Sequence, residues 1–101
     1  MIRERDIEKQ LTRRVKDAGG LSYKWDSPGS EGVPDRIIIM PGGKIYFVEL
    51  KTTTGRLSHM QKWQHTRLKN KQCSVYTVYG QAGLDLFMKD IMEDLTDDDK
   101  G

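Results

Sequence analysis

The sequence predicts a single α/β domain in which helices flank one mixed β-sheet. Apolar residues recur at helical spacing near both ends of the chain, and a Pro-Gly-Gly turn at residues 41–43 separates two apolar strands. A polar helix and another strand follow this hairpin. With 101 residues, of which 36% are hydrophobic, the chain has room for one small domain with a modest core.

The elements are expected in the order helix, strands with a hairpin, helix, strand, helix. The first helix spans residues 3–18 and ends at two glycines, and a short strand covers residues 21–25. The later elements are strands at 36–40 and 44–50, a helix from an N-cap at Ser58 to about Lys71, a strand at 74–79, and a final helix around 84–91. Residues 1–93 form the domain, and the acidic residues 94–101 are expected to be a disordered tail.

The length of the hairpin loop decides which side chains share a face of the sheet. If the loop comprises residues 41–43, Asp35 falls opposite Glu49, and directly opposed residues point to the same face. Lys51 lies two residues beyond Glu49 and shares that face. A loop of two residues would shift the pairing by one and separate the two carboxylates.

Two facing carboxylates beside an amine suggest metal-dependent phosphodiester hydrolysis. The carboxylates of Asp35 and Glu49 would repel each other unless a cation lay between them. Mg²⁺ is held by one or two carboxylates and keeps several waters for itself and a phosphate substrate. A lysine at position 51 could orient a water or stabilise charge that develops on phosphorus.

Two acids of the first helix are further candidates. Glu4 lies inside the apolar arc of the helix and Glu8 lies at its edge, one turn later. The simpler interpretation is a boundary carboxylate that pairs with Arg5, Thr12 or a lysine. The alternative is that one acid reaches the hairpin face as a metal ligand, and Glu8 is the expected one because an edge position buries no charge in the core.

Polar residues around the hairpin could support the site or contact a substrate. Gln61 completes a capping box with Ser58, and it could also face the site and bind a water or a phosphate. Lys24, Arg56 and Lys62 could contact a phosphate backbone, although each could equally be a solvated surface residue.

Composition narrows the classes of partner and environment. Residues 94–101 carry a net charge of −3, so residues 1–93 carry +5, which suits a polyanion such as DNA. One cysteine excludes an internal disulfide and fits a reducing cytoplasm, and two histidines with one cysteine make a zinc site improbable. The sequence contains no secretion signal and no apolar run long enough to span a membrane.

Several segments together resemble the VRR-NUC family, a branch of the PD-(D/E)xK nucleases with the restriction-endonuclease-like fold. The resemblance covers roughly residues 4–90 and rests on four segments in order: Gly32–Arg36, Pro41–Gly43, Phe47–Lys51, and Gly55–Ser58 with Gln61. A lone Asp…Glu-x-Lys triple is weak, but all these segments at compact spacing are a specific pattern.

The resemblance implies roles for individual residues. Asp35 and Glu49 would bind Mg²⁺ or Mn²⁺, the Leu50 carbonyl would be a further ligand, and Lys51 would position the attacking water. Glu8 resembles the helical acid of the family, with Glu4 left open, and Gln61 has a supporting role. Small members from phages and prophages imply a homodimer that cuts branched DNA, such as four-way junctions or flaps, in the cytoplasm of a host bacterium.

Two other functions remain open. A non-catalytic DNA-binding module could keep the fold, in which case Glu49 and Lys51 would be an ordinary ion pair. An RNA nuclease would use the same residues, because the sequence shows no aromatic stacking platform that distinguishes the sugar.

Overall fold

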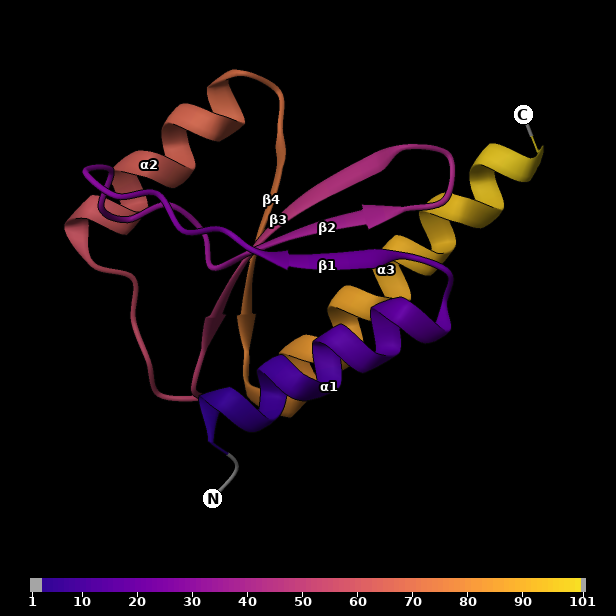
Figure 1. Cartoon of the computed structure of the whole chain (residues 1–101), viewed down its shortest axis with the longest axis horizontal. Helices are drawn as coiled ribbons and strands as arrows, with labels where there is room; N and C mark the ends of the chain where they lie inside the picture. Colours follow the sequence, from indigo (N-terminus) through magenta and orange to yellow (C-terminus); the bar gives the residue numbers. More distant parts are fainter. Residues whose placement is uncertain (1–2, 101) are drawn as a thin grey trace.

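The computed structural model describes residues 3–100, and the side chains of residues 3–96. Its elements follow the predicted order (Figure 1). They are α1 (Glu4–Asp17), β1 (Leu21–Lys24), β2 (Arg36–Met40), β3 (Lys44–Lys51), α2 (His59–Asn70), β4 (Ser74–Tyr79) and α3 (Gly80–Lys100).

The four strands form one mixed sheet in the order β1-β2-β3-β4. The first three strands are antiparallel, and β4 runs parallel to β3 because α2 connects them as a crossover. Met40 pairs with Lys44, so the hairpin loop is the predicted three-residue turn 41–43. Gly42 and Gly43 have φ of 88° and 79°, values that glycine adopts without strain.

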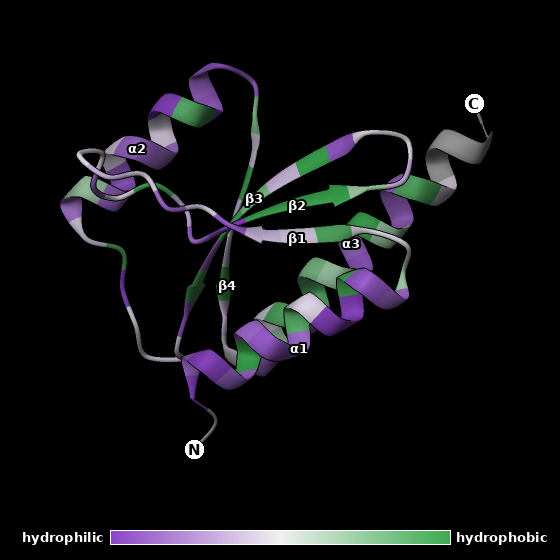
Figure 2. Ribbon diagram, in the orientation of Figure 1, coloured by the Kyte–Doolittle hydropathy of each residue, from purple (hydrophilic) through white to green (hydrophobic). Residues whose placement is uncertain are grey.

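The two faces of the sheet are covered differently. Tyr46, Val48 and Leu50 point to one face, where they join buried side chains of α1 and α3 in the hydrophobic core. The alternating β3 residues, from Phe47 to Lys51, point to the other face, which α2 covers. Figure 2 shows green residues along β2 and mostly purple ones along α2. The fold therefore has its buried core on one side of the sheet. The other side carries Glu49 and Lys51 near α2, together with apolar side chains that include Ile39, Ile45 and Phe47.

The helix α2 begins at the predicted N-cap. The Ser58 hydroxyl accepts a hydrogen bond from the Gln61 backbone N–H at 3.1 Å, and the Gln61 side chain accepts one from the Ser58 N–H at 2.8 Å. This reciprocal pair satisfies two donors that a helix start otherwise leaves unpaired. The capping box thereby fixes the orientation of the Gln61 side chain.

The helix α3 continues through residues 94–100, where the composition predicts a disordered tail. Asp94 accepts a hydrogen bond from the Tyr46 hydroxyl at 2.8 Å, and Leu95 packs against the core. These contacts place the first residues of the expected tail within the domain, and Gly101 lies outside the described residues. None of the helices in the described chain combines the length and apolarity needed to cross a bilayer.

Candidate active site

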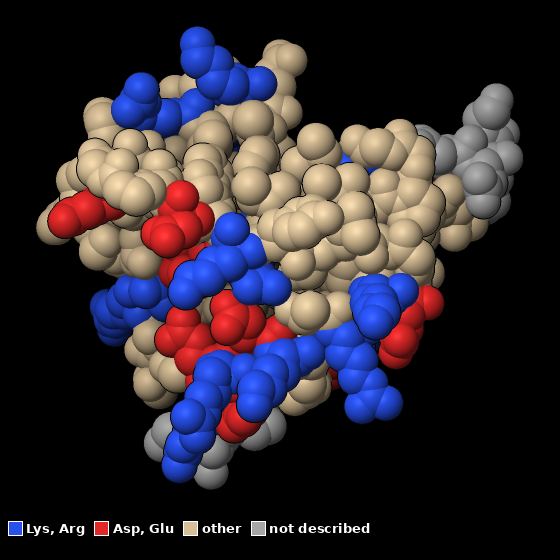
Figure 3. Space-filling model, viewed as in Figure 1, with Lys and Arg blue, Asp and Glu red and all other residues tan. Residues whose placement is uncertain are grey.

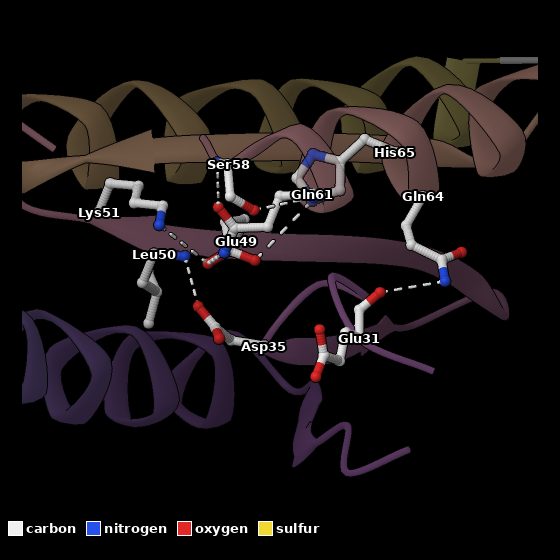
Figure 4. Close-up of polar contacts among 9 residues, drawn as sticks. All are labelled: Glu31, Asp35, Glu49, Leu50, Lys51, Ser58, Gln61, Gln64 and His65. Atoms are coloured by element: carbon white, nitrogen blue, oxygen red, sulfur yellow. Dashed lines mark hydrogen bonds and ion pairs between the residues drawn. The ribbon is translucent and has the colours of Figure 1, made fainter. Parts of the chain in front are cut away.

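Asp35 lies just before β2, where the backbone holds it against the end of β3. The Leu50 backbone N–H donates to Asp35 Oδ2 at 2.8 Å, and the Trp25 N–H donates to the Asp35 carbonyl at 2.8 Å. The observed pairing, continued by one residue, sets Asp35 opposite Glu49. Figure 4 shows Asp35, Glu49 and Lys51 gathered at this end of the sheet. The three-residue turn therefore sets Asp35 opposite Glu49, as the sequence predicted.

Glu49 is a buried carboxylate at the centre of this group, with 2% of its surface exposed. Gln61 Nε2 donates to its Oε2 at 3.1 Å, and Lys51 Nζ lies 3.9 Å from the same oxygen. Its other oxygen, Oε1, has no hydrogen-bond partner among the described residues. A buried oxygen without a partner costs free energy and needs an explanation.

The charge state of Glu49 depends on burial and on Asp35. Burial, the negative charge of Asp35 and a hydrogen bond with its carboxyl raise the pKa of Glu49 from 4.5 to about 8, although Lys51 opposes the shift. Two neighbouring carboxylates repel each other when both are ionised, and a bound cation would compensate that repulsion.

His65 is a site residue that the sequence analysis missed. Its Nε2 lies 3.8 Å from Glu49 Oε1, and neither atom has a hydrogen-bond partner within the described chain. Burial, followed by the charge of Lys69, lowers the pKa of His65, so the imidazole is neutral at neutral pH. The sequence did hold a signal, since His65 follows Gln61 by four residues and so shares its helical face.

The two helical acids have different surroundings. Glu8 Oε2 lies 3.7 Å from Arg36 Nη1, so this carboxylate is paired, although with Arg36 and not with Arg5, Thr12 or a lysine. Burial, then the charge of Asp35, raises the pKa of Glu4, and the charge of Lys51 opposes the rise. The charges of Asp35 and Lys51 thus act on Glu4. The choice between Glu8 and Glu4 as the helical ligand stays a prediction.

Arg36 is the second residue that the sequence analysis missed. Its guanidinium donates to the Thr12 hydroxyl at 3.0 Å and to the Ser22 hydroxyl at 3.1 and 3.2 Å. With its contact to Glu8, the side chain joins α1, β1 and β2 directly beside Asp35. Its side chain is 13% exposed. Arg36 thus fixes the position of α1 relative to the site.

The remaining candidates lie around this group. Gln61 caps α2 with its oxygen and also faces the site, because its amide nitrogen reaches Glu49. Its binding of a water or a phosphate stays a prediction. Lys24, Arg56 and Lys62 are exposed at the end of β1, in the loop before α2 and on α2. Their contacts with a substrate, like the use of the Leu50 carbonyl as a ligand, stay predictions.

The chemistry of the site fits a divalent cation held by few protein ligands. No cluster of three Asp, Glu, His or Cys side chains close enough to bind a metal occurs among the described residues. Two carboxylates that repel each other, one with an unpartnered oxygen, are the oxygen donors that a hard cation such as Mg²⁺ prefers. Asp35 and Glu49 would hold such an ion, and water and substrate oxygens would complete its coordination.

Comparison with known proteins agrees with this geometry. No family model matches the sequence. A protein of Acyrthosiphon pisum secondary endosymbiont phage 1, described as "Putative nuclease p44", is 47% identical over 68 residues, which cover 67% of this chain and 73% of that protein. A solved structure described as a VRR_NUC domain superposes with a TM-score of 0.81 at 29% identity, covering 85% of this chain and 94% of the other. The chain therefore has the restriction-endonuclease-like fold and belongs to the VRR-NUC family of nucleases.

Proposed function

We propose that this nuclease is a Mg²⁺- or Mn²⁺-dependent endonuclease that hydrolyses phosphodiester bonds in branched DNA and acts as a homodimer. The observation that carries the proposal is the buried carboxylate of Glu49 beside the half-buried carboxylate of Asp35, with Lys51 Nζ 3.9 Å from Glu49. A structural ion pair would not need a second carboxylate whose presence raises the pKa of the first. The pair is costly unless a cation and a phosphate occupy the site.

A divalent cation bound there would supply charge that lets both carboxylates ionise and that neutralises phosphate oxygens. Asp35 and Glu49 would bind the cation and orient it. The Leu50 N–H holds one oxygen of Asp35 in place, and Gln61 Nε2 holds one oxygen of Glu49. Lys51, whose side chain is 19% exposed, can orient the attacking water or stabilise negative charge on the phosphate. Glu4, rather than the expected Glu8, is the proposed third acid.

Cleavage of labelled four-way junction, flap and linear duplex DNA tests this function. Wild type with Mg²⁺ or Mn²⁺ should cut branched DNA faster than linear duplex, and Lys51→Ala should reduce the rate by about 100-fold or more. Lys16→Ala, an exposed lysine of α1, is the matched control and should cut at the wild-type rate. Failure of wild type to cut any substrate, or full activity of Lys51→Ala, would refute the function.

Asp35→Asn separates chemistry from binding. This substitution should abolish cleavage. It should retain DNA affinity in a gel-shift assay, because it removes one negative charge from a surface that contacts phosphates. If a calorimetric titration with Mn²⁺ shows no binding to wild type, the protein is instead a non-catalytic DNA-binding module. The same cleavage assay with RNA versions of these substrates tests whether the nuclease acts on DNA or on RNA.

The homodimer and the DNA contacts are separate parts of the proposal. The small core and the family resemblance support a dimer, which light scattering coupled to size exclusion measures directly. Lys24, Arg56 and Lys62 are the proposed backbone contacts, and alanine at each should weaken binding to all DNA sequences and lower its salt dependence. The proposed setting is the cytoplasm of a host bacterium.

A further inference from the structure

A pocket between α2 and the loop before Asp35 lies beside the carboxylate site. Its volume is about 310 Å³, at the small end of the range for ligand pockets. Its lining combines an aromatic ring, apolar side chains, an amide and two basic groups, including Trp25, Val33, Leu68, Gln64, Arg67 and Lys71. We propose that it binds one unpaired nucleotide of the DNA substrate, with the base on Trp25 and a phosphate on Arg67 and Lys71. The inference deepens the proposed function and rests on it.

The pocket walls are held together by local contacts. Gln64 Nε2 donates to the Glu31 carbonyl at 3.1 Å, which ties α2 to the loop (Figure 4). Gly32 has a φ of 89°, and a Cβ there would lie 2.5 Å from the Met60 carbonyl oxygen. Only a glycine lets the loop backbone lie this close to α2. The pocket is therefore formed before any ligand binds.

The chemistry of the lining suits a nucleotide. The Trp25 ring lies 5.2 Å from that of Phe47, so packing sets its orientation, and an indole face can stack with any base. The Arg67 guanidinium lies 4.5 Å from the ring centre of Trp63, which restrains the side chain at the pocket rim. None of the described lining residues is acidic, and Figure 3 shows Lys and Arg side chains gathered over α2. The basic side chains of Arg67 and Lys71 would therefore attract a phosphate.

The position of the pocket explains why an unpaired nucleotide would be selected. Phe47, which packs on Trp25, lies two residues before Glu49 on the same face of β3, or about 6–7 Å along the strand. Val33 of the lining likewise precedes Asp35 by two residues. A base in the pocket would therefore belong to a nucleotide one or two places from the cleaved phosphate. A base inside a duplex is stacked on both faces and would have to leave the helix to reach Trp25.

Tryptophan fluorescence can report on this pocket directly. The chain has two tryptophans, so Trp63→Phe leaves Trp25 as the sole reporter. In EDTA, which prevents metal-dependent cleavage, a five-nucleotide oligothymidylate should quench Trp25 emission saturably, and a blunt hairpin duplex should not. No response to the oligonucleotide, an equal response to the duplex, or the same response to a poly-glutamate peptide would overturn the inference.

Charge-matched variants test the phosphate contacts. Arg67→Ala with Lys71→Ala should weaken oligonucleotide binding by about 10-fold or more, and should lower the slope of log affinity against log salt by about 1.4. Lys16→Ala with Lys89→Ala removes the same charge from α1 and α3 and should change both quantities much less. Equal losses of oligonucleotide affinity in the two double variants would show that only the overall charge of the protein matters, and would overturn the inference.

The stacking contact has its own conservative variant. Trp25→Phe should retain most of the oligonucleotide affinity, whereas Trp25→Leu should lose about 10-fold, with thermal melting used to confirm that both variants fold. Equal affinities of the two folded variants would contradict stacking. Because all of these measurements are made in EDTA, they do not depend on catalysis. A wild type that cuts no DNA refutes the proposed function, while one that cuts DNA without a Trp25 response refutes only the pocket.

Discussion

The buried carboxylate of Glu49 predicts that the metal-free protein loses stability as pH rises. Its pKa is about 8 in the folded protein, against 4.5 for an ordinary glutamate. Between these values the folded state retains a proton that the unfolded state has released. The free energy of unfolding should therefore fall with pH, by at most about 1.4 kcal/mol per pH unit from this group. The contribution is fully present below pH 4.5 and is lost as pH rises through about 8.

The variant Glu49→Gln isolates this contribution, because a neutral amide cannot ionise. We expect the variant to lack this fall in stability and to become more stable than wild type above pH 8, even though it should be inactive. Glu93→Gln, an exposed acid of α3, is the matched control and should follow the wild-type pH dependence. Mn²⁺ should reduce the pH dependence of wild type, since a bound cation favours the ionised carboxylate.

Urea unfolding at pH 5, 6.5 and 8.5, in EDTA and in Mn²⁺, measures these free energies. The informative quantity is the difference between wild type and Glu49→Gln at each pH, because titrating groups that do not interact with Glu49 cancel in it. A difference that stays constant across this range in EDTA would show that the carboxyl is not held protonated by burial and by Asp35. The physical account of the site would then be wrong.

The remaining predictions concern residues that position the site. Glu4→Gln should reduce the cleavage rate by about 10-fold or more, whereas Glu8→Gln should mainly reduce stability in urea. The reverse result in these two assays would identify Glu8 as the helical ligand. Arg36→Met removes the part-buried guanidinium that contacts Thr12 and Glu8, and it should lower the free energy of unfolding by about 1–3 kcal/mol in urea. A smaller loss would show that packing alone positions α1. Ser58→Ala removes the α2 cap and should cost about 1 kcal/mol by the same assay; a loss below 0.5 kcal/mol would show that the cap contributes little.

The local geometry of the hairpin could be predicted from the sequence because short-range rules govern it. A Pro-Gly-Gly turn of three residues fixed the register, and the register fixed which side chains share a face. The capping box of α2 is likewise local, since Ser58 and Gln61 are three residues apart. These two features brought Asp35, Glu49 and Gln61 together in the prediction and in the structure.

Contacts between elements could not be predicted in this way. A helical wheel shows that Glu4 and Glu8 lie on neighbouring positions, but it does not show where the helix lies relative to the sheet. Arg36 decides that placement through partners distant in sequence, including Thr12. The approach of His65 to Glu49 also depends on how α2 sits on β3, although spacing alone placed it on the same side of α2 as Gln61.

The position of α2, on the side of the sheet away from the buried core, separates two kinds of evolutionary constraint. Among the α2 residues only His65 is buried, and the helix is attached largely through polar groups. Substitutions on the outer surface of α2 would therefore change the proposed nucleic-acid contacts of this helix without disturbing the buried core. Specificity in this nuclease can diversify independently of foldability.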